Sequence, residues 1–135
     1  MRIVFFILLL LHGGIHLTGF MQAFGLINLN GFSPILSRTF GILWLMVFIL
    51  FLATAFLFKF QQANWHKIAF AAILLSQALV IHSWQDAKFG TILNLLIFCV
   101  AFLAFAASNF KESYTRDVKK QLNYRADQYM ALLTE

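Results

Sequence analysis

Residues 39–58 read TFGILWLMVFILFLATAFLF, a run of twenty residues without a formal charge between Arg38 and Lys59. A helix needs about 20 largely apolar residues to cross the hydrocarbon core of a bilayer. Because the hydrocarbon offers no water to the backbone, a helix that pairs its own N–H and C=O groups is the favoured spanning structure. This stretch therefore predicts a transmembrane helix.

Residues 3–37, 68–85 and 89–110 also carry no formal charge. Of the 135 residues, 61% are hydrophobic and 11% are charged, whereas a soluble domain usually has about 25% charged residues to cover its core. The composition predicts an all-α, polytopic membrane protein. Its four spans are expected at about 3–27, 39–58, 68–85 and 89–110.

The predicted connections are short, which makes successive helices antiparallel neighbours. We therefore expect residues 1–110 to form a four-helix, up-down transmembrane bundle. The longest connection, NLNGFSPILSR at 28–38, has Asn, Gly, Ser and Pro in the spacing of turns. Its apolar residues 32–36 are expected to lie along the outer membrane surface.

The first span has a second interpretation. Arg2 followed by an apolar run resembles a secretory signal peptide. However, the apolar character continues to Ile27, and no clean small-x-small cleavage site follows the first run. We therefore predict a retained helix.

The basic residues predict the orientation. Short loops rich in Lys and Arg stay in the cytoplasm, and the side that holds both termini carries most of these residues. The opposite side has only Arg38 and Lys88. We expect both termini in the cytoplasm. The net charge of +5 then reflects topology and attraction to anionic lipid, and no nucleic-acid partner is expected.

Residues 111–135 are charged and differ from the spans. Apolar residues at spacings of four and seven predict an amphipathic helix, which lies on the cytoplasmic membrane surface or links to something else. These apolar residues are Tyr114, Val118, Leu122, Tyr129 and Leu133. Since Leu-Leu-Thr-Glu contains no stop signal, a soluble domain after residue 135 is one expected partner, and another membrane protein is the alternative.

Five polar side chains inside the predicted spans are informative because burying them in lipid is costly. From a rise of 1.5 Å per helical residue, His12 and Gln77 each lie about 14 Å from the cytoplasmic edge. His16, His82 and Asn94 lie about 20–22 Å from that edge. The spacing predicts two layers: His12 with Gln77, and His16 with His82 and Asn94.

The two histidines of the first span share one side of the helix with Gly19 and Ala23. Small residues on such a stripe let a neighbouring helix approach closely, and polar ones bond across the interface. We expect this stripe to face the third and fourth spans. The second span has almost nothing polar in its centre and is expected to pack mostly against lipid.

Three interpretations of the intramembrane polar residues stay open. They fix the helix register through hydrogen bonds, or they line a pocket for a small molecule such as a quinone or a lipid head group. In the third, His16 and His82 ligate one haem iron, and no other metal site is predicted. The candidate ligand-binding residues are His12, His16, Gln77, His82, Trp84, Gln85, Asp86 and Asn94.

The single cysteine, Cys99, lies midway along the fourth span. Without a second thiol it forms neither an internal disulfide nor a CxxC redox pair. We expect a small, buried apolar residue.

Three segments carry a resemblance to a known family: LHGGIHLTGF (11–20), SRTFGILWL (37–45) and WQDAKFGTILN (84–94). Together they resemble an uncharacterised family of bacterial four-helix membrane proteins, and the layout is loosely similar to DoxX-like proteins. The resemblance implies a location in a bacterial inner (plasma) membrane, and a membrane part that is often followed by a soluble domain. DoxX itself is linked to quinone-dependent thiosulfate oxidation, but no catalytic motif in this sequence transfers from it.

The sequence contains no nucleophile–base arrangement, carboxylate pair or phosphate loop, and our interpretation leans away from an enzyme. The leading hypothesis is a membrane anchor or interaction domain with a polar interior near the outer leaflet. The alternative is a redox or small-molecule-binding module that uses the intramembrane histidines, with quinone, lipid or haem as its ligand.

Overall fold

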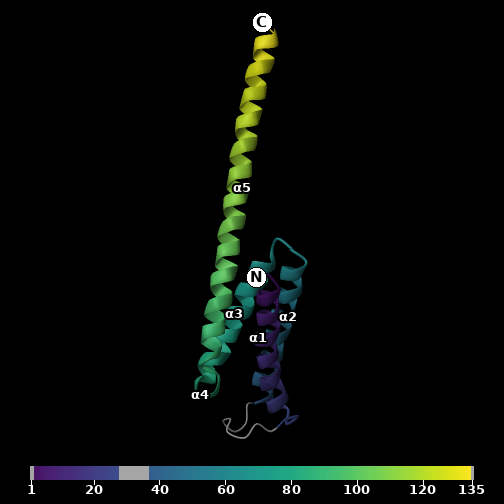
Figure 1. Cartoon of the computed structure of the whole chain (residues 1–135), viewed down its shortest axis with the longest axis vertical. Helices are drawn as coiled ribbons and strands as arrows, with labels where there is room; N and C mark the ends of the chain where they lie inside the picture. Colours follow the sequence, from purple (N-terminus) through teal and green to yellow (C-terminus); the bar gives the residue numbers. More distant parts are fainter. Residues whose placement is uncertain (1, 28–36, 135) are drawn as a thin grey trace. The chain divides into compact units, whose positions relative to one another are not determined.

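The computed structural model describes residues 2–27 and 37–134, and these residues form helices joined by turns (Figure 1). The all-α prediction is confirmed for this part of the chain. The loop prediction at 28–36 lies outside the described residues. The elements are α1 (Arg2–Ala23), α2 (Arg38–Lys59), α3 (Trp65–His82), the single turn α4 (Trp84–Ala87) and α5 (Gly90–Thr134).

Helices α1, α2, α3 and α5 are each long and apolar enough to cross a membrane. Several bounds differ from the predicted spans. Helix α1 ends at Ala23 rather than at residue 27, α3 covers Trp65–His82 rather than 68–85, and α5 continues to Thr134 rather than ending at residue 110. The four apolar segments that the sequence predicts therefore all appear as helices.

The end of α1 has a local cause in the sequence. Gly25 has a positive φ of 68°, the left-handed conformation that glycine adopts without a steric penalty. The Gly25 N–H donates to the Gln22 carbonyl at 3.0 Å, and the Leu26 N–H donates to the Met21 carbonyl at 2.8 Å. This pair of bonds is a Schellman motif, which satisfies the last carbonyls of the helix. An apolar run alone does not reveal this end.

The chain divides into two compact units, residues 1–102 and residues 103–135. In the first unit α1 packs along α2, and α2 packs along α3. The beginning of α5 belongs to the same unit, because Asn94 is hydrogen-bonded to side chains of α1 and α3. The candidate site described below lies entirely in this unit.

Helix α2 forms a large part of the core. Its buried residues include Trp44, Val47, Phe51 and Ala55, and they join Leu9 of α1 in the main hydrophobic cluster. One side of this span therefore belongs to the core, but only about a third of its apolar stretch is buried, and the expectation that it packs mostly against lipid stays a prediction. A helix without polar residues is equally suited to lipid and to a protein core, so composition does not separate the two environments.

Two glycines let α1 and α2 approach closely. A Cβ atom built on Gly19 would lie 2.5 Å from the Trp44 ring, and one on Gly41 would lie 2.5 Å from the Ala23 Cβ. Both distances are far below van der Waals contact. The small residues of the α1 stripe therefore face α2, and not the third and fourth spans as predicted, whereas the two histidines of the stripe do reach α3 and α5.

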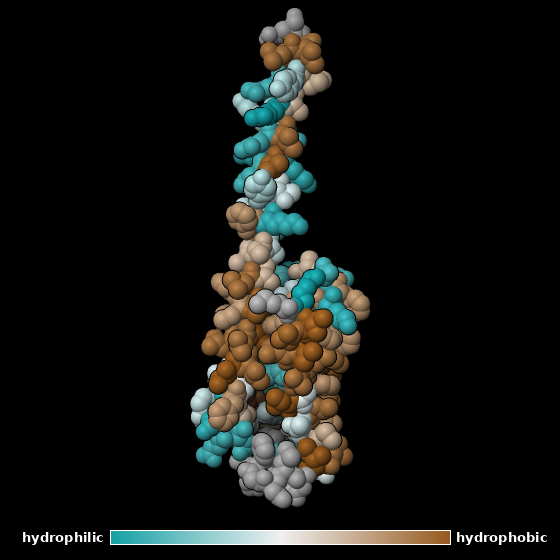
Figure 2. All heavy atoms as spheres, viewed as in Figure 1, coloured by the Kyte–Doolittle hydropathy of each residue, from teal (hydrophilic) through white to brown (hydrophobic). Residues whose placement is uncertain are grey.

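Much of the surface of the first unit is apolar. Figure 2 shows mainly hydrophobic residues on one face of this unit and many more hydrophilic residues over the second. Large apolar side chains are exposed on every long helix of the first unit, among them Ile3, Ile7, Ile49, Leu74 and Leu96. Exposed apolar surface of this extent marks contact with lipid or with another protein.

The second unit consists of the remainder of α5. The helix continues without a break through residue 111, where the sequence analysis separated the fourth span from the C-terminal helix. Tyr114, Leu122 and Tyr129 of the predicted amphipathic stripe are exposed. Arg116 and Glu112 form an exposed i,i+4 ion pair at 3.4 Å, a contact of little energetic consequence.

Cys99 is exposed on α5, so the prediction that it is buried is wrong. The buried residues of this part of α5 are Asn94, Ile97 and Ala101. They recur at spacings of three and four and so occupy one side of the helix. Cys99 lies two residues from Ile97 and Ala101, which turns it away from that side.

Candidate functional site

The core of the candidate site is a network of buried hydrogen bonds centred on Asn94. Asn94 Oδ1 accepts from the Ser76 hydroxyl at 2.9 Å and lies 2.8 Å from His12 Nε2. Ser76 Oγ lies 2.9 Å from His16 Nε2. The network thus joins α1, α3 and α5 through side chains that are each at most 2% exposed.

The network continues toward the side of Asn94 that carries its amino group. Asn94 Nδ2 donates to Gln77 Oε1 at 3.0 Å, and Gln77 Nε2 donates to Thr91 Oγ1 at 3.1 Å. Both amide atoms of Asn94 are therefore hydrogen-bonded. Buried polar groups in a membrane-like interior need such partners, which explains why α3 and α5 have these residues at facing positions.

The direction of these bonds assigns the hydrogen on each histidine. Asn94 Oδ1 is an acceptor only, so His12 Nε2 donates its N–H to it. Ser76 has one hydroxyl hydrogen, which it donates to Asn94, so His16 Nε2 donates to the Ser76 oxygen. A neutral imidazole has a single N–H. Both histidines therefore have a lone pair on Nδ1.

Aromatic rings of α2 surround the two histidines. The His16 ring stacks on Phe51, with centroids 5.7 Å apart, and lies 5.0 Å from the Trp44 ring. The His12 ring meets the edge of Phe51 at 4.7 Å. Gly13 leaves room for this contact, since its Cβ would lie 3.1 Å from the Phe51 Cβ. These rings fix the orientation of both imidazoles.

Three buried polar atoms have no hydrogen-bond partner within residues 2–27 and 37–134: His12 Nδ1, His16 Nδ1 and Trp44 Nε1. We call them the open atoms. The first two are acceptors and the third is a donor. An unpaired buried polar group costs about 1–3 kcal/mol, and nearly all such groups in folded proteins find a partner. Three of them in one place require an explanation.

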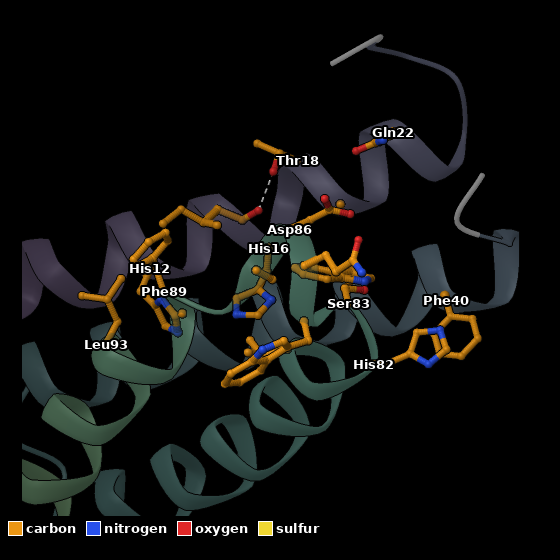
Figure 3. A pocket seen from close by; sticks show the side chains of 18 of the residues that line it. His12, His16, Thr18, Gln22, Phe40, His82, Ser83, Asp86, Phe89 and Leu93 are labelled. Atoms are coloured by element: carbon orange, nitrogen blue, oxygen red, sulfur yellow. Dashed lines mark hydrogen bonds between the residues drawn. The ribbon is translucent and has the colours of Figure 1, made fainter. Parts of the chain in front are cut away.

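All three residues with open atoms line a cavity of about 680 Å³ (Figure 3). Small-molecule sites have volumes of about 300–1,000 Å³ and are lined mostly by apolar groups with a few polar ones. Apolar side chains such as Phe40, Val80 and Leu93 supply much of the wall. In Figure 3, His16 lies between the labelled groups around His12 and those around Ser83 and Asp86.

The structure places the eight predicted ligand-binding residues in two groups. His12, His16, His82, Trp84, Gln85 and Asp86 line the cavity. Gln77 and Asn94 belong to the hydrogen-bond network behind the histidines. Trp84, Gln85 and Asp86 belong to the short helix α4, which lies in the cavity wall.

The predicted layers differ from those observed. Asn94 was predicted in the layer of His16, but it forms a hydrogen bond with His12. His16 was predicted beside His82, but it forms a hydrogen bond with Ser76. Since His82 is six residues beyond Ser76, it lies about 9 Å farther along the axis of α3. It stacks on Phe40 with ring centroids 4.1 Å apart and lies beside that ring in Figure 3.

The observed neighbours bear on the haem hypothesis. His16 packs on rings of α2 and donates through Nε2 to Ser76, whereas His82 packs on Phe40. The structure thus does not pair the two imidazoles, and haem ligation by them stays a prediction. Within the described parts of the chain, no group of three or more His, Cys, Asp or Glu residues is placed to hold a metal ion.

Sequence reasoning missed two important residues, Ser76 and Trp44. Serine in a helix commonly bonds its own backbone, so one serine in an apolar span is a weak signal. Trp44 was hidden in an apolar run that resembles a lipid-facing helix. The available signal was Gly19, since a glycine on the same side as two histidines indicates a large partner side chain on another helix.

Comparisons with protein-family models, with curated proteins and with solved structures found no match for this chain.

Proposed function

We propose that this chain is a polytopic membrane protein whose first unit spans the inner membrane of a bacterium as an up-down four-helix bundle. The length and apolar character of α1, α2, α3 and α5 support the proposal, as do the exposed apolar side chains on each of them. The distribution of Lys and Arg favours cytoplasmic termini. The cavity then lies in the outer half of the membrane.

We further propose that the unit binds a small, uncharged, mainly apolar molecule in this cavity. The observation that carries the proposal is a cavity of about 680 Å³ whose wall includes three residues that each have an open atom. A bound molecule with a polar group would complete the hydrogen bonding of these atoms. The binding interpretation is therefore favoured over the leading hypothesis of an anchor or interaction domain.

The physical contrast with an anchor is direct. An anchor needs helices that hold together, and the network around Asn94 already fixes their register. The open atoms of His16 and Trp44 contribute nothing to that register, because within the described structure they bond no helix. Their energetic cost is offset when a ligand pairs with them.

Accessibility labelling tests the topology. In a Cys99→Ser background, Lys88→Cys places a thiol after α4 and Gln62→Cys places one between α2 and α3, both at exposed positions. A membrane-impermeant maleimide applied to intact cells should label Lys88→Cys and not Gln62→Cys. The second variant should react only after permeabilisation. The reverse pattern would contradict the proposed orientation, and labelling of both would contradict the four spans.

Equilibrium dialysis tests ligand binding. The protein is reconstituted in lipid nanodiscs and dialysed with naphthalene against empty nanodiscs of the same lipid. We expect a saturable excess of about one molecule per chain, as a single site predicts. Ala87→Phe, which fills space in the cavity wall, should remove it, whereas the matched control Ala78→Phe, at an exposed position outside the wall, should retain it. No saturable excess in the wild-type protein would show that the proposal is wrong.

A further inference from the structure

The open atoms specify the chemistry of the ligand, which rests on the function proposed above. His16 Nδ1 has a lone pair and Trp44 Nε1 has a hydrogen, and both atoms are buried. The two rings are neighbours, with centroids 5.0 Å apart and planes inclined by 40°. A single group that bonds both atoms must donate one hydrogen bond and accept another. Among uncharged organic groups, a hydroxyl does both with one oxygen.

We propose that the cavity binds an uncharged alcohol or phenol with an apolar body, and that its hydroxyl is held between His16 Nδ1 and Trp44 Nε1. The hydroxyl hydrogen goes to the imidazole lone pair, and the hydroxyl oxygen accepts the indole N–H. His12 Nδ1 is a second acceptor in the same wall. A second hydroxyl on the ligand is the natural donor to it.

Other ligand chemistries leave a group unpaired. A ketone or an ether only accepts, so it pairs with the Trp44 N–H and places a second lone pair against the histidines. A pure hydrocarbon leaves all three open atoms without a bond. A hydroxyl ligand thus pairs with both the His16 lone pair and the Trp44 N–H, which a ketone, an ether or a hydrocarbon does not. Sites that recognise a hydroxyl in this way discriminate strongly against analogues that lack it.

The network behind His16 determines which side of the imidazole the ligand meets. Asn94 accepts from both His12 and Ser76, and this arrangement places the histidine hydrogens on Nε2 and the lone pairs on Nδ1. Ser76 and Asn94 are therefore positioning residues, and His16 and Trp44 are the ligand-binding ones. The aromatic contact with Phe51 at 5.7 Å holds the His16 ring in this orientation.

Four probes of similar size test the inference in nanodiscs by the dialysis described above: naphthalene, 1-naphthol, 1-methoxynaphthalene and 1-tetralone. We expect 1-naphthol to bind at least about ten-fold more tightly than each of the other three after correction for lipid partition, a difference of about 1.4 kcal/mol. Equal affinities would overturn the inference and leave the proposed function in place. Tighter binding of 1-tetralone than of 1-naphthol would also overturn it, because the site would then offer a donor but no acceptor for a hydroxyl hydrogen.

Two variants locate the discrimination. Trp44→Phe removes the N–H without breaking any hydrogen bond within the described residues, and His16→Gln keeps a donor that can reach Ser76 while losing Nδ1. In each variant the preference for 1-naphthol over 1-methoxynaphthalene should fall to less than about three-fold. Trp65→Phe is the matched control, since Trp65 packs on Phe5 and Phe58 away from the cavity wall, and its preference should be unchanged.

The outcomes separate the two proposals. If none of the four probes binds the wild-type protein saturably, the proposed function fails. If they bind without preference, only the hydroxyl inference fails. If the preference survives both Trp44→Phe and His16→Gln, the hydroxyl is held elsewhere and the assignment to these residues is wrong. Thermal unfolding of each variant in detergent first establishes that the variant is folded. If His16→Gln does not fold, Trp44→Phe alone tests the assignment.

Discussion

The two ends of the first unit differ in how the space between the helices is filled. At the end near Phe5, aromatic rings close the interface: Phe5 meets the edge of Phe58 at 4.9 Å and of Trp65 at 5.9 Å, and Phe58 meets Trp65 at 5.0 Å. At the other end, His16 and Trp44 border a cavity of about 680 Å³. One end is a packed core and the other is built around a space.

The difference teaches what each end contributes. Aromatic rings packed edge to face need no hydrogen-bond partner, and each pair stabilises the fold by roughly 0.5–1.5 kcal/mol beyond the effect of burial. Polar atoms are satisfied only by a partner, so the open atoms at the second end lower stability until something binds. We therefore expect changes at the first end to affect stability alone, and changes at the second to affect binding as well.

The largest effect is expected for Asn94→Leu. It removes the acceptor of His12 and Ser76 and the donor to Gln77, and leaves these buried groups unpaired. We expect the free energy of unfolding to fall by about 2–4 kcal/mol, measured by denaturant titration in mixed micelles. The control is Asn109→Leu, at an exposed position on the same helix. A loss below the control's would mean that the network does not hold α1, α3 and α5 together.

Glycine substitutions on α1 give an intermediate effect. A Cβ at Gly19 would meet the Trp44 ring at 2.5 Å, whereas one at Gly14 would meet nothing within 4 Å. Gly19→Ala should destabilise by about 1–3 kcal/mol through overpacking, and it should weaken naphthalene binding because Trp44 must shift. Gly14→Ala should leave both quantities unchanged or raise stability slightly. Equal behaviour of the two variants in the same titrations would contradict the close approach of α1 and α2.

The smallest effect is expected at the aromatic end. Phe5→Leu loses the ring contacts to Phe58 and Trp65 but keeps an apolar side chain. Unfolding in micelles should show a loss of about 1 kcal/mol, and dialysis should show naphthalene affinity within two-fold of wild type. A clear loss of affinity would mean that the aromatic end and the cavity end of the unit are coupled.

The sequence predicted the helices well and their partners less well. Four uncharged apolar runs are enough to predict four helices, because length and composition decide that property. They did not reveal which side of α2 is buried in the core, since lipid and a protein interior select the same residues. The ends of α1 and α3 were also displaced, because local turns such as the one at Gly25 end a helix within an apolar run.

The sequence predicted most residues of the candidate site but not the hydrogen bonds between them. Six of the eight predicted residues line the cavity, because a polar side chain in an apolar span is visible in the sequence. The pairing of His12 with Asn94 and of His16 with Ser76 was not visible. Depth estimates carry an error of a helical turn when the ends and tilts of the helices are unknown, and one turn changes which residues meet.

The sequence by itself thus determined that this protein consists of long apolar helices with a few polar groups in their middle. Only the tertiary structure decided that Asn94 bonds His12 and reaches His16 through Ser76, that the Trp44 ring packs against His16, and that three residues of one cavity wall each have an open atom. The physical reason is that hydrogen bonding across helices depends on their rotation and axial offset. These are set by close contacts such as Gly19 with Trp44 and Gly41 with Ala23, which exist only after the helices have packed.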